Sequence, residues 1–149
     1  MSDLAQTISY HVKDITPIRF EISGEYKSGE TLCGTQSIED LLDRDTKKGI
    51  CAKAPGMIMF ELNDTWDFEE IEVAGWTGNT TLWTPGNGVS SAISTSIDNV
   101  TYKNVGALPS NFSGVITTVK LARTSAKFIK FESKSLLGLG FLNIKKMPK

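Results

Sequence analysis

Two tryptophans lie in an unusual polar stretch, GWTGNTTLWTPGNG, which runs from Gly75 to Gly88. An indole face stacks on the apolar face of a sugar ring, and amide or hydroxyl side chains bind the sugar hydroxyls. Functional residues also concentrate on loops, so this composition predicts a binding site. The expected ligand-binding residues, for a glycan or a protein, are Trp76, Asn79, Trp83, Asn87 and Arg123, the last near a turn in ARTSAK.

Two other interpretations of this stretch stay open. Tryptophan is largely buried on average, so both indoles could fold inward and close one end of the core. Tryptophan is also enriched at the energetic centre of protein interfaces. A contact with a neighbouring subunit is therefore the third interpretation, and the residues alone do not separate the three.

An oxygen-rich segment contains Asp43, Asp45 and Thr46. Calcium prefers six to eight oxygen ligands in which carboxylates and carbonyls are mixed, and this segment offers such atoms. A structural calcium ion is therefore one interpretation of this segment. The alternative is a solvated turn in which Asp43 accepts hydrogen bonds from nearby backbone N–H groups.

Residues for catalysis are sparse. The only histidine is His11, close to the N-terminus, so neither a serine nor Cys33 or Cys51 has a second choice of base. No P-loop or dinucleotide-binding fingerprint occurs. Adjacent carboxylates such as Glu69 and Glu70 are present, but nothing in the sequence sets them across a cleft. The sequence predicts a protein that is not an enzyme.

Two cysteines and one histidine cannot complete a zinc site. The N-terminal residues lack the basic start and the apolar run of a secretory signal. Free thiols at Cys33 and Cys51 are therefore expected in preference to a disulfide. The lack of a recognisable secretory signal also predicts that the protein stays in the cytoplasm or is part of a virion.

Length and composition set the class of protein. The chain has 149 residues, 40% of them hydrophobic and 22% charged, which suits one globular domain. The formal net charge of −1 provides no basic footprint for a nucleic acid. No segment approaches the ~18 apolar residues of a membrane-spanning helix. Nucleic-acid partners and membrane insertion are excluded on these grounds.

Short strands must position the candidate residues. Ile18, Phe20 and Ile22 alternate with charged residues, which is the period of a strand, and the apolar run from Met57 to Leu62 predicts a central strand. The segment FELNDTWDFEEIEVAGW, residues 60–76, is predicted as a hairpin with a polar turn. Its tryptophan, Trp66, is expected to cover the core side of that hairpin, with an exposed anchor as the alternative.

The rest of the chain continues this pattern. AISTSI and VTYKNV flank the turn pair Asp98-Asn99, and GVITTVKLA, AKFIKF and LGLGFLNI predict further strands. Only SIEDLLD has helical character, for a turn or two. Many short strands separated by turns predict an all-β antiparallel sandwich or barrel. Residues 1–17 are expected to form an N-terminal arm or edge strand, and residues 18–149 a single domain.

Five segments carry a family resemblance: SIEDLLDRDTKKGICA, GMIMFELNDTWDFEEIEVAGW, ISTSIDNVTYKNVG, TVKLARTSAKFIKFES and LGLGFLNIKKM. Their order resembles that of galactose-binding-like, discoidin-type (coagulation factor 5/8 type C) modules over roughly residues 30–146. The resemblance implies a jelly-roll β-sandwich with loops gathered at one end. It also implies calcium at Asp43 to Thr46, with Asn143 as the nearest counterpart of a ligand from the closing strand. Lys127 and Lys130 stand where many members carry pocket arginines.

Two functional hypotheses follow. In the first, the chain is a non-catalytic assembly module, a structural subunit of a larger particle such as a phage tail or capsid surface. It would contact partner proteins in a homo- or hetero-oligomer through its arm and loops, and bind surface glycans as well. The alternative is a stand-alone carbohydrate-binding, lectin-like module stabilised by calcium.

Overall fold

The computed structural model describes residues 15–23, 38–42, 49–52, 56–76, 91–108, 115–134 and 137–147. The elements are β1 (Pro17–Ser23), the 3₁₀ helix η1 (Ile38–Leu41), β2 (Ile50–Ala52), β3 (Gly56–Gly75), β4 (Ser91–Ser96), β5 (Lys103–Gly106), β6 (Thr117–Ser133) and β7 (Leu137–Ile144). The all-β prediction is confirmed, and η1 supplies the short helix expected in SIEDLLD. No helix in the described part of the chain has the length and apolar character needed to cross a membrane.

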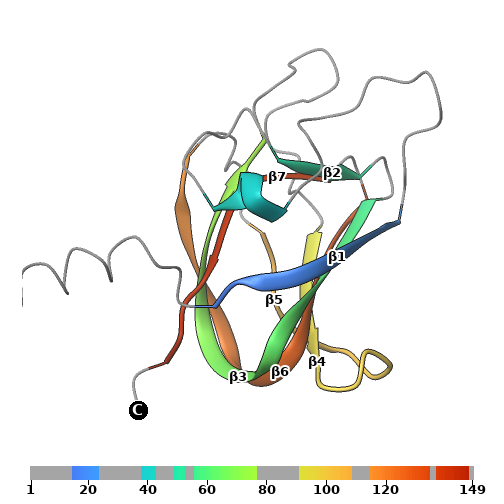
Figure 1. The fold of residues 1–149 in the computed structure, drawn as a ribbon, viewed down its shortest axis with the longest axis vertical. Coiled ribbons are helices and arrows are strands. Elements are labelled where there is room, and N and C mark those ends of the chain that lie inside the picture. The colour runs from blue at the N-terminus through green and yellow to red at the C-terminus, as the bar shows by residue number, and fades with distance from the viewer. Residues whose placement is uncertain are drawn as a thin grey trace, which may run out of the picture.

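The strands β3 and β6 are long and strongly curved. Each runs through one layer, bends, and continues through the second layer, so together they form the U at the base of Figure 1. The predicted hairpin at residues 60–76 is therefore wrong, because this segment is one continuous strand. Its polar residues Asn63, Asp64 and Thr65 lie exposed at the bend, where the pairing register with β6 shifts. Polar residues are exposed to water at a bend as they are at a turn. The difference is that the backbone stays extended through a bend.

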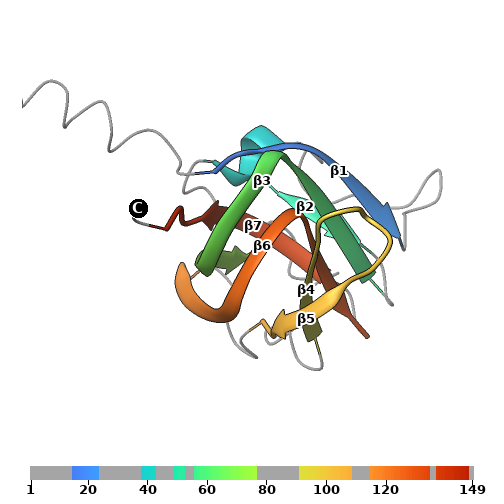
Figure 2. The same cartoon turned by 90° about the horizontal axis from the view of Figure 1, so that it is seen from below.

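Two layers face each other across the core (Figure 2). The five-stranded layer consists of β1, the first part of β3, the last part of β6, β4 and β5. The four-stranded layer consists of β2, β7, the last part of β3 and the first part of β6. All pairs are antiparallel, as expected, and the curved strands join both layers into one hydrogen-bonded sheet.

Alternating apolar residues fill the space between the layers. Ile58, Phe60 and Phe131 enter it from the five-stranded layer, and Ile71 and Leu139 from the four-stranded layer; all are fully buried. The rings of Phe60 and Phe131 meet edge to face, with centroids 5.9 Å apart and an interplanar angle of 77°. This geometry is favoured between aromatic rings and adds to the hydrophobic term.

Trp66 lies at the bend of β3 and packs half-buried against the core, which confirms that it covers the core edge. Its indole Nε1 donates a hydrogen bond to Asn63 Oδ1 at 2.9 Å. The ammonium of Lys146 lies 4.8 Å from the ring centroid and makes a cation–π contact. These contacts hold the indole in place over the end of the core.

The start of the described chain belongs to the sandwich. Ile15 is buried and forms an isolated bridge with Ile144, and β1 begins at Pro17. The last residues of the predicted arm are therefore part of the sheet. Residues 1–14 lie outside the described residues.

The expectation of free thiols is wrong. Cys51, fully buried in β2, is disulfide-bonded, and Cys33, outside the described residues, is the only other cysteine in the sequence. The expectation rested on the composition of the N-terminal residues, which carries no information about how close two thiols lie in the folded chain. A disulfide is typical of proteins that mature in an oxidising environment.

Candidate functional site

Four strands start or finish together at one end of the five-stranded layer, which we call the loop end. Ser23 at the end of β1 pairs with Met57 near the start of β3. Met57 pairs in turn with Glu132 on β6, and Glu132 with Ala92 on β4. Residues that pair in register project to the same face of a sheet. Since the neighbouring residues of this row fill the core, the row itself projects outward.

This row forms the floor of a pocket of about 420 Å³, which we call the loop-end pocket. Glu132 contributes a carboxylate whose side chain is 48% exposed and lies 3.6 Å from the Lys130 ammonium. Met57 supplies a half-buried apolar surface. The lining consists of Ser23, Gly56, Met57, Ala92, Glu132, Ser133 and Lys134. The pocket thus offers hydrogen-bond donors and acceptors around one apolar patch.

Trp76 lies directly after β3, and its side chain is only 1% exposed. This burial agrees with the interpretation in which the indole folds inward and closes one end of the core. Its backbone N–H donates a hydrogen bond to the Gly138 carbonyl at 3.3 Å. The indole therefore packs inside the protein and is not presented to a ligand at the surface. The other predicted loop residues, Asn79, Trp83 and Asn87, lie outside the described residues. The chain re-enters the described structure at Ser91, next to Ala92 of the loop-end pocket.

Arg123 lies far from Trp76 and the loop-end pocket. The turn predicted in ARTSAK does not form, because β6 is continuous, and Arg123 is an exposed residue close to the bend. Its neighbour Thr124 pairs with Phe68, eight residues before Trp76 along β3. At ~3.3 Å per strand residue, this separation is roughly 25 Å. The structure does not bring Arg123 together with Trp76.

Of the four predicted metal ligands, only Asn143 belongs to the described residues. Asn143 on β7 donates a hydrogen bond from Nδ2 to Glu72 Oε1 at 3.0 Å, while its buried Oδ1 has no hydrogen-bond partner. Among the described residues, no group of three or more His, Cys, Asp or Glu side chains could hold a metal ion. Asp43, Asp45 and Thr46 lie outside the described residues. The calcium site stays a prediction.

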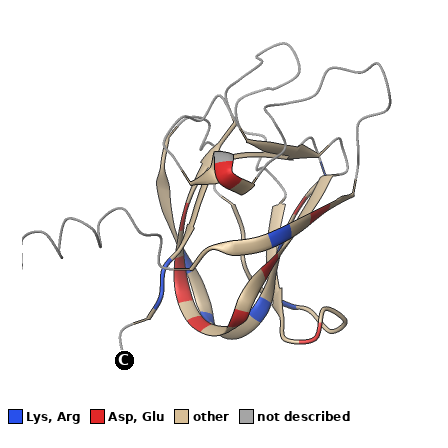
Figure 3. Cartoon of the chain, viewed as in Figure 1, with Lys and Arg blue, Asp and Glu red and all other residues tan. Residues whose placement is uncertain are grey.

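Charges of both signs are interleaved along the strands (Figure 3). Glu61 accepts a hydrogen bond from Arg19 Nε and lies 3.5 Å from the Lys127 ammonium. Glu70 lies 3.4 Å from Lys120 and 3.5 Å from Lys145. Each of these two carboxylates thus lies close to two basic side chains.

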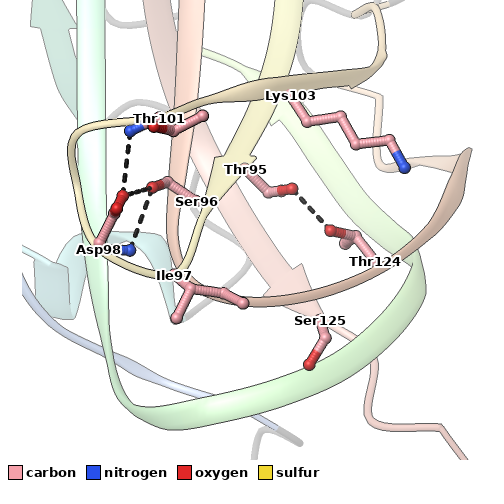
Figure 4. A pocket seen from close by; sticks show the side chains of 8 residues that line it. All are labelled: Thr95, Ser96, Ile97, Asp98, Thr101, Lys103, Thr124 and Ser125. Atoms are coloured by element: carbon pink, nitrogen blue, oxygen red, sulfur yellow. Dashed lines mark hydrogen bonds between the residues drawn. The ribbon is translucent and has the colours of Figure 1, made fainter.

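A second pocket, of about 300 Å³, lies at the opposite end, where β3 and β6 bend and the loop of residues 97–102 joins β4 to β5 (Figure 4). We call it the bend-end pocket. The buried hydroxyls of Thr95 and Thr124 meet there at 2.6 Å and connect the two layers. Its lining consists of Thr95, Ser96, Ile97, Asp98, Thr101, Lys103, Thr124 and Ser125.

Asp98 fixes the loop beside the bend-end pocket. Its Oδ1 accepts hydrogen bonds from the backbone N–H groups of Val100 and Thr101, at 2.9 and 3.0 Å, and from Ser96 Oγ at 3.0 Å. The backbone donors of Thr101 and Val100, followed by Ser96, hold the pKa of the Asp98 carboxyl below its ordinary value. Asn99 takes a φ of 63°, a conformation that asparagine tolerates in turns. The predicted turn pair thus lies in a longer, internally bonded loop.

Asp98→Asn should make the protein less sensitive to acid. The folded pKa of Asp98 lies below the ordinary value of 3.8, so its ionised form contributes stability above that pH, which is lost as the pH falls through the folded pKa. Urea midpoints of wild type and variant, compared from about pH 6 to about pH 3, should therefore converge as the pH falls. Asp67→Asn, at an exposed carboxylate on β3, is the control and should keep the wild-type pH dependence. A constant difference between wild type and Asp98→Asn would contradict this prediction.

The site residues that sequence reasoning missed are Glu132, Lys134 and the Thr95–Thr124 pair. Alternation in AKFIKFES indicates that Glu132 projects outward. The sequence gives no indication that Ser23, Met57 and Ala92 lie in the same row, because that depends on the pairing of four distant segments.

Comparisons with known proteins agree with this architecture. No protein-family model matches the sequence, and no curated protein matches it. The module CpGH89CBM32-5 from Clostridium perfringens, solved with GalNAc-β-1,3-galactose, has a TM-score of 0.66 and 14% identity, covering 88% of this chain and 99% of that one. A pectin-binding carbohydrate-binding module has a TM-score of 0.63 and 15% identity, covering 90% and 94%. The family 32 module of C. perfringens NanJ, solved with galactose, has a TM-score of 0.63 and 14% identity, covering 89% and 98%.

These likenesses span nearly the whole of each compared chain. Together with the strand order and the curved strands, they show that the chain has the galactose-binding-like, discoidin-type β-sandwich fold. The family resemblance noted in the sequence is confirmed at the level of the fold.

Proposed function

We propose that this chain is a non-catalytic carbohydrate-binding module that binds a saccharide at the loop-end pocket. The observation that carries the proposal is the outward row from Ser23 to Ala92, which together with Lys134 sets a carboxylate, an ammonium and a hydroxyl around an apolar patch. Saccharides require this mixture, because they present hydroxyls at the ring edge and C–H groups on the ring face. Two of the structurally similar modules were solved with galactose or a galactose-containing disaccharide.

Each lining residue has a role in this proposal. The Glu132 carboxylate accepts hydrogen bonds from sugar hydroxyls, and Lys134 and Ser23 donate them. Met57 contacts the C–H face of the ring. Trp83, a ligand-binding residue expected from the sequence, is proposed to stack on the sugar ring.

The carbohydrate hypothesis replaces the assembly hypothesis as the first choice. The similar structures named above are carbohydrate-binding modules, and none is a subunit of a virus particle. The disulfide at Cys51 supports a site of action in an oxidising environment, outside the cytoplasm.

Glu132→Gln should weaken sugar binding by about 10- to 100-fold, because hydrogen bonds to a charged group contribute ~1.5–3 kcal/mol. Calorimetric titration with galactose and N-acetylgalactosamine, preceded by a glycan array, measures the effect. Glu69→Gln is the matched control, since Glu69 is an exposed carboxylate on the last part of β3 and does not line the pocket. Trp83→Ala should weaken binding in the same assay. Wild-type protein that binds no glycan on the array would overturn the proposal.

A further inference from the structure

The bend-end pocket is separate from the proposed saccharide site. The two pockets share no lining residue. Both involve β4, but Ala92 projects outward at one end of this strand, whereas Thr95 projects toward the core at the other. A ligand in one pocket therefore leaves the other accessible.

Several polar groups in the bend-end pocket are available to a ligand. Lys103 is exposed, and no ion pair or hydrogen bond joins its ammonium to the rest of the described chain. In the bond between Thr95 and Thr124 only one hydroxyl donates, so the other keeps its hydrogen for a further acceptor. Lys103 pairs in register with Thr95, so its side chain projects to the same face of the sheet as the threonine pair (Figure 4). The Lys103 ammonium and the remaining hydroxyl hydrogen of the threonine pair are donors for an anionic oxygen.

Two other residues that line the pocket, Ile97 and Asp98, narrow the chemical class of the ligand. Ile97 is 60% exposed at the edge of the pocket and offers an apolar surface to C–H groups. Asp98 Oδ1 is saturated by three donors, and its second oxygen has no hydrogen bond from the described residues, so it can accept one from a ligand hydroxyl. A bare inorganic anion would use neither Ile97 nor Asp98, whose negative charge opposes it.

We infer that the bend-end pocket is a second saccharide site, selective for one sugar ring that carries a carboxylate, as in a uronic acid. The carboxylate pairs with Lys103 and accepts a hydrogen bond from whichever hydroxyl of the Thr95–Thr124 pair keeps its hydrogen. The ring face contacts Ile97, and a ring hydroxyl donates to Asp98. A volume of about 300 Å³ lies at the low end of small-molecule sites, which suits a single ring. With two sites the module binds one polymer at two places, or bridges two polymers.

Chemical-shift titration of the ¹⁵N-labelled full chain tests this inference. Galacturonic acid should shift the amide resonances of Thr101, Lys103 and Ser125, whereas galactose should shift those of Ala92 and Glu132. Lys103→Met should weaken galacturonate binding at these amides by at least about tenfold, as expected for the loss of a charged hydrogen bond. Lys103→Arg should retain most of the affinity, and Lys120→Met, at an exposed lysine that lines neither pocket, should leave it unchanged.

The outcomes of this titration distinguish the proposed function from the second site. Failure of galactose to bind, with intact galacturonate shifts at Lys103, would overturn the proposed function but support the second site. Sulfate that shifts the same amides as strongly as galacturonate would show a general anion site and overturn the inference. Equal binding by Lys103→Met and wild type would also overturn it.

Discussion

Trp76→Ala should lower the free energy of unfolding by about 3–5 kcal/mol, the usual cost of truncating a buried tryptophan. The Trp76 side chain is 1% exposed, so its removal leaves a cavity between the ends of β3 and β7 that the strands cannot easily fill. Urea denaturation followed by circular dichroism measures this loss. For a chain of this size, such a loss would shift the thermal midpoint by roughly 10 °C or more.

Trp66→Ala is the matched control for Trp76→Ala. Trp66 is half-exposed at the bend of β3, so less apolar surface returns to water and the loss should be clearly smaller. Binding measurements separate the two interpretations of Trp76. If Trp76→Ala keeps wild-type stability but loses sugar binding, the indole is a ligand contact and its assignment to the core fails.

Gly49→Ala should be the most damaging single-methyl change on the described part of the chain, with a loss of about 3 kcal/mol, the upper end of the ~1–3 kcal/mol typical of overpacking. Gly49 precedes β2, and a Cβ there would overlap the carbonyl oxygen of Leu139 and lie 3.0 Å from its carbonyl carbon. These are backbone atoms of β7, the partner strand of β2. A side chain at Gly49 must therefore push the two strands apart.

Gly106→Ala provides the control for this effect. A Cβ at Gly106 would meet Leu121 Cδ2 at 2.9 Å, the far end of a side chain that can rotate away. The variant should unfold within about 1 kcal/mol of wild type, since the lower backbone entropy of alanine offsets part of the strain. Equal losses for the two variants in urea denaturation would contradict the explanation from backbone proximity.

Part of the candidate site was predictable from the sequence. The polar composition between Trp76 and Ser91 indicates a loop, and the structure places both of these residues at strand ends. The role of Trp76 was not predictable, because the same residue in the same sequence can face solvent or the core. Burial depends on what the neighbouring strand provides, and here the chain beside Trp76 is β7, more than sixty residues away in the sequence.

The sequence by itself determined where most strands lie and which side chains enter the core. Alternation is a local property of an extended chain, so Ile58, Phe60 and Phe131 could be assigned to one face without knowledge of their partners. The order of segments also identified the class of sandwich. Only the tertiary structure decided that the polar break at Asn63 to Thr65 is a bend and not a turn, because both conformations expose polar residues equally well. It also decided the disulfide at Cys51 and the composition of both pockets, since these depend on register between strands far apart in the chain, which local periodicity does not encode.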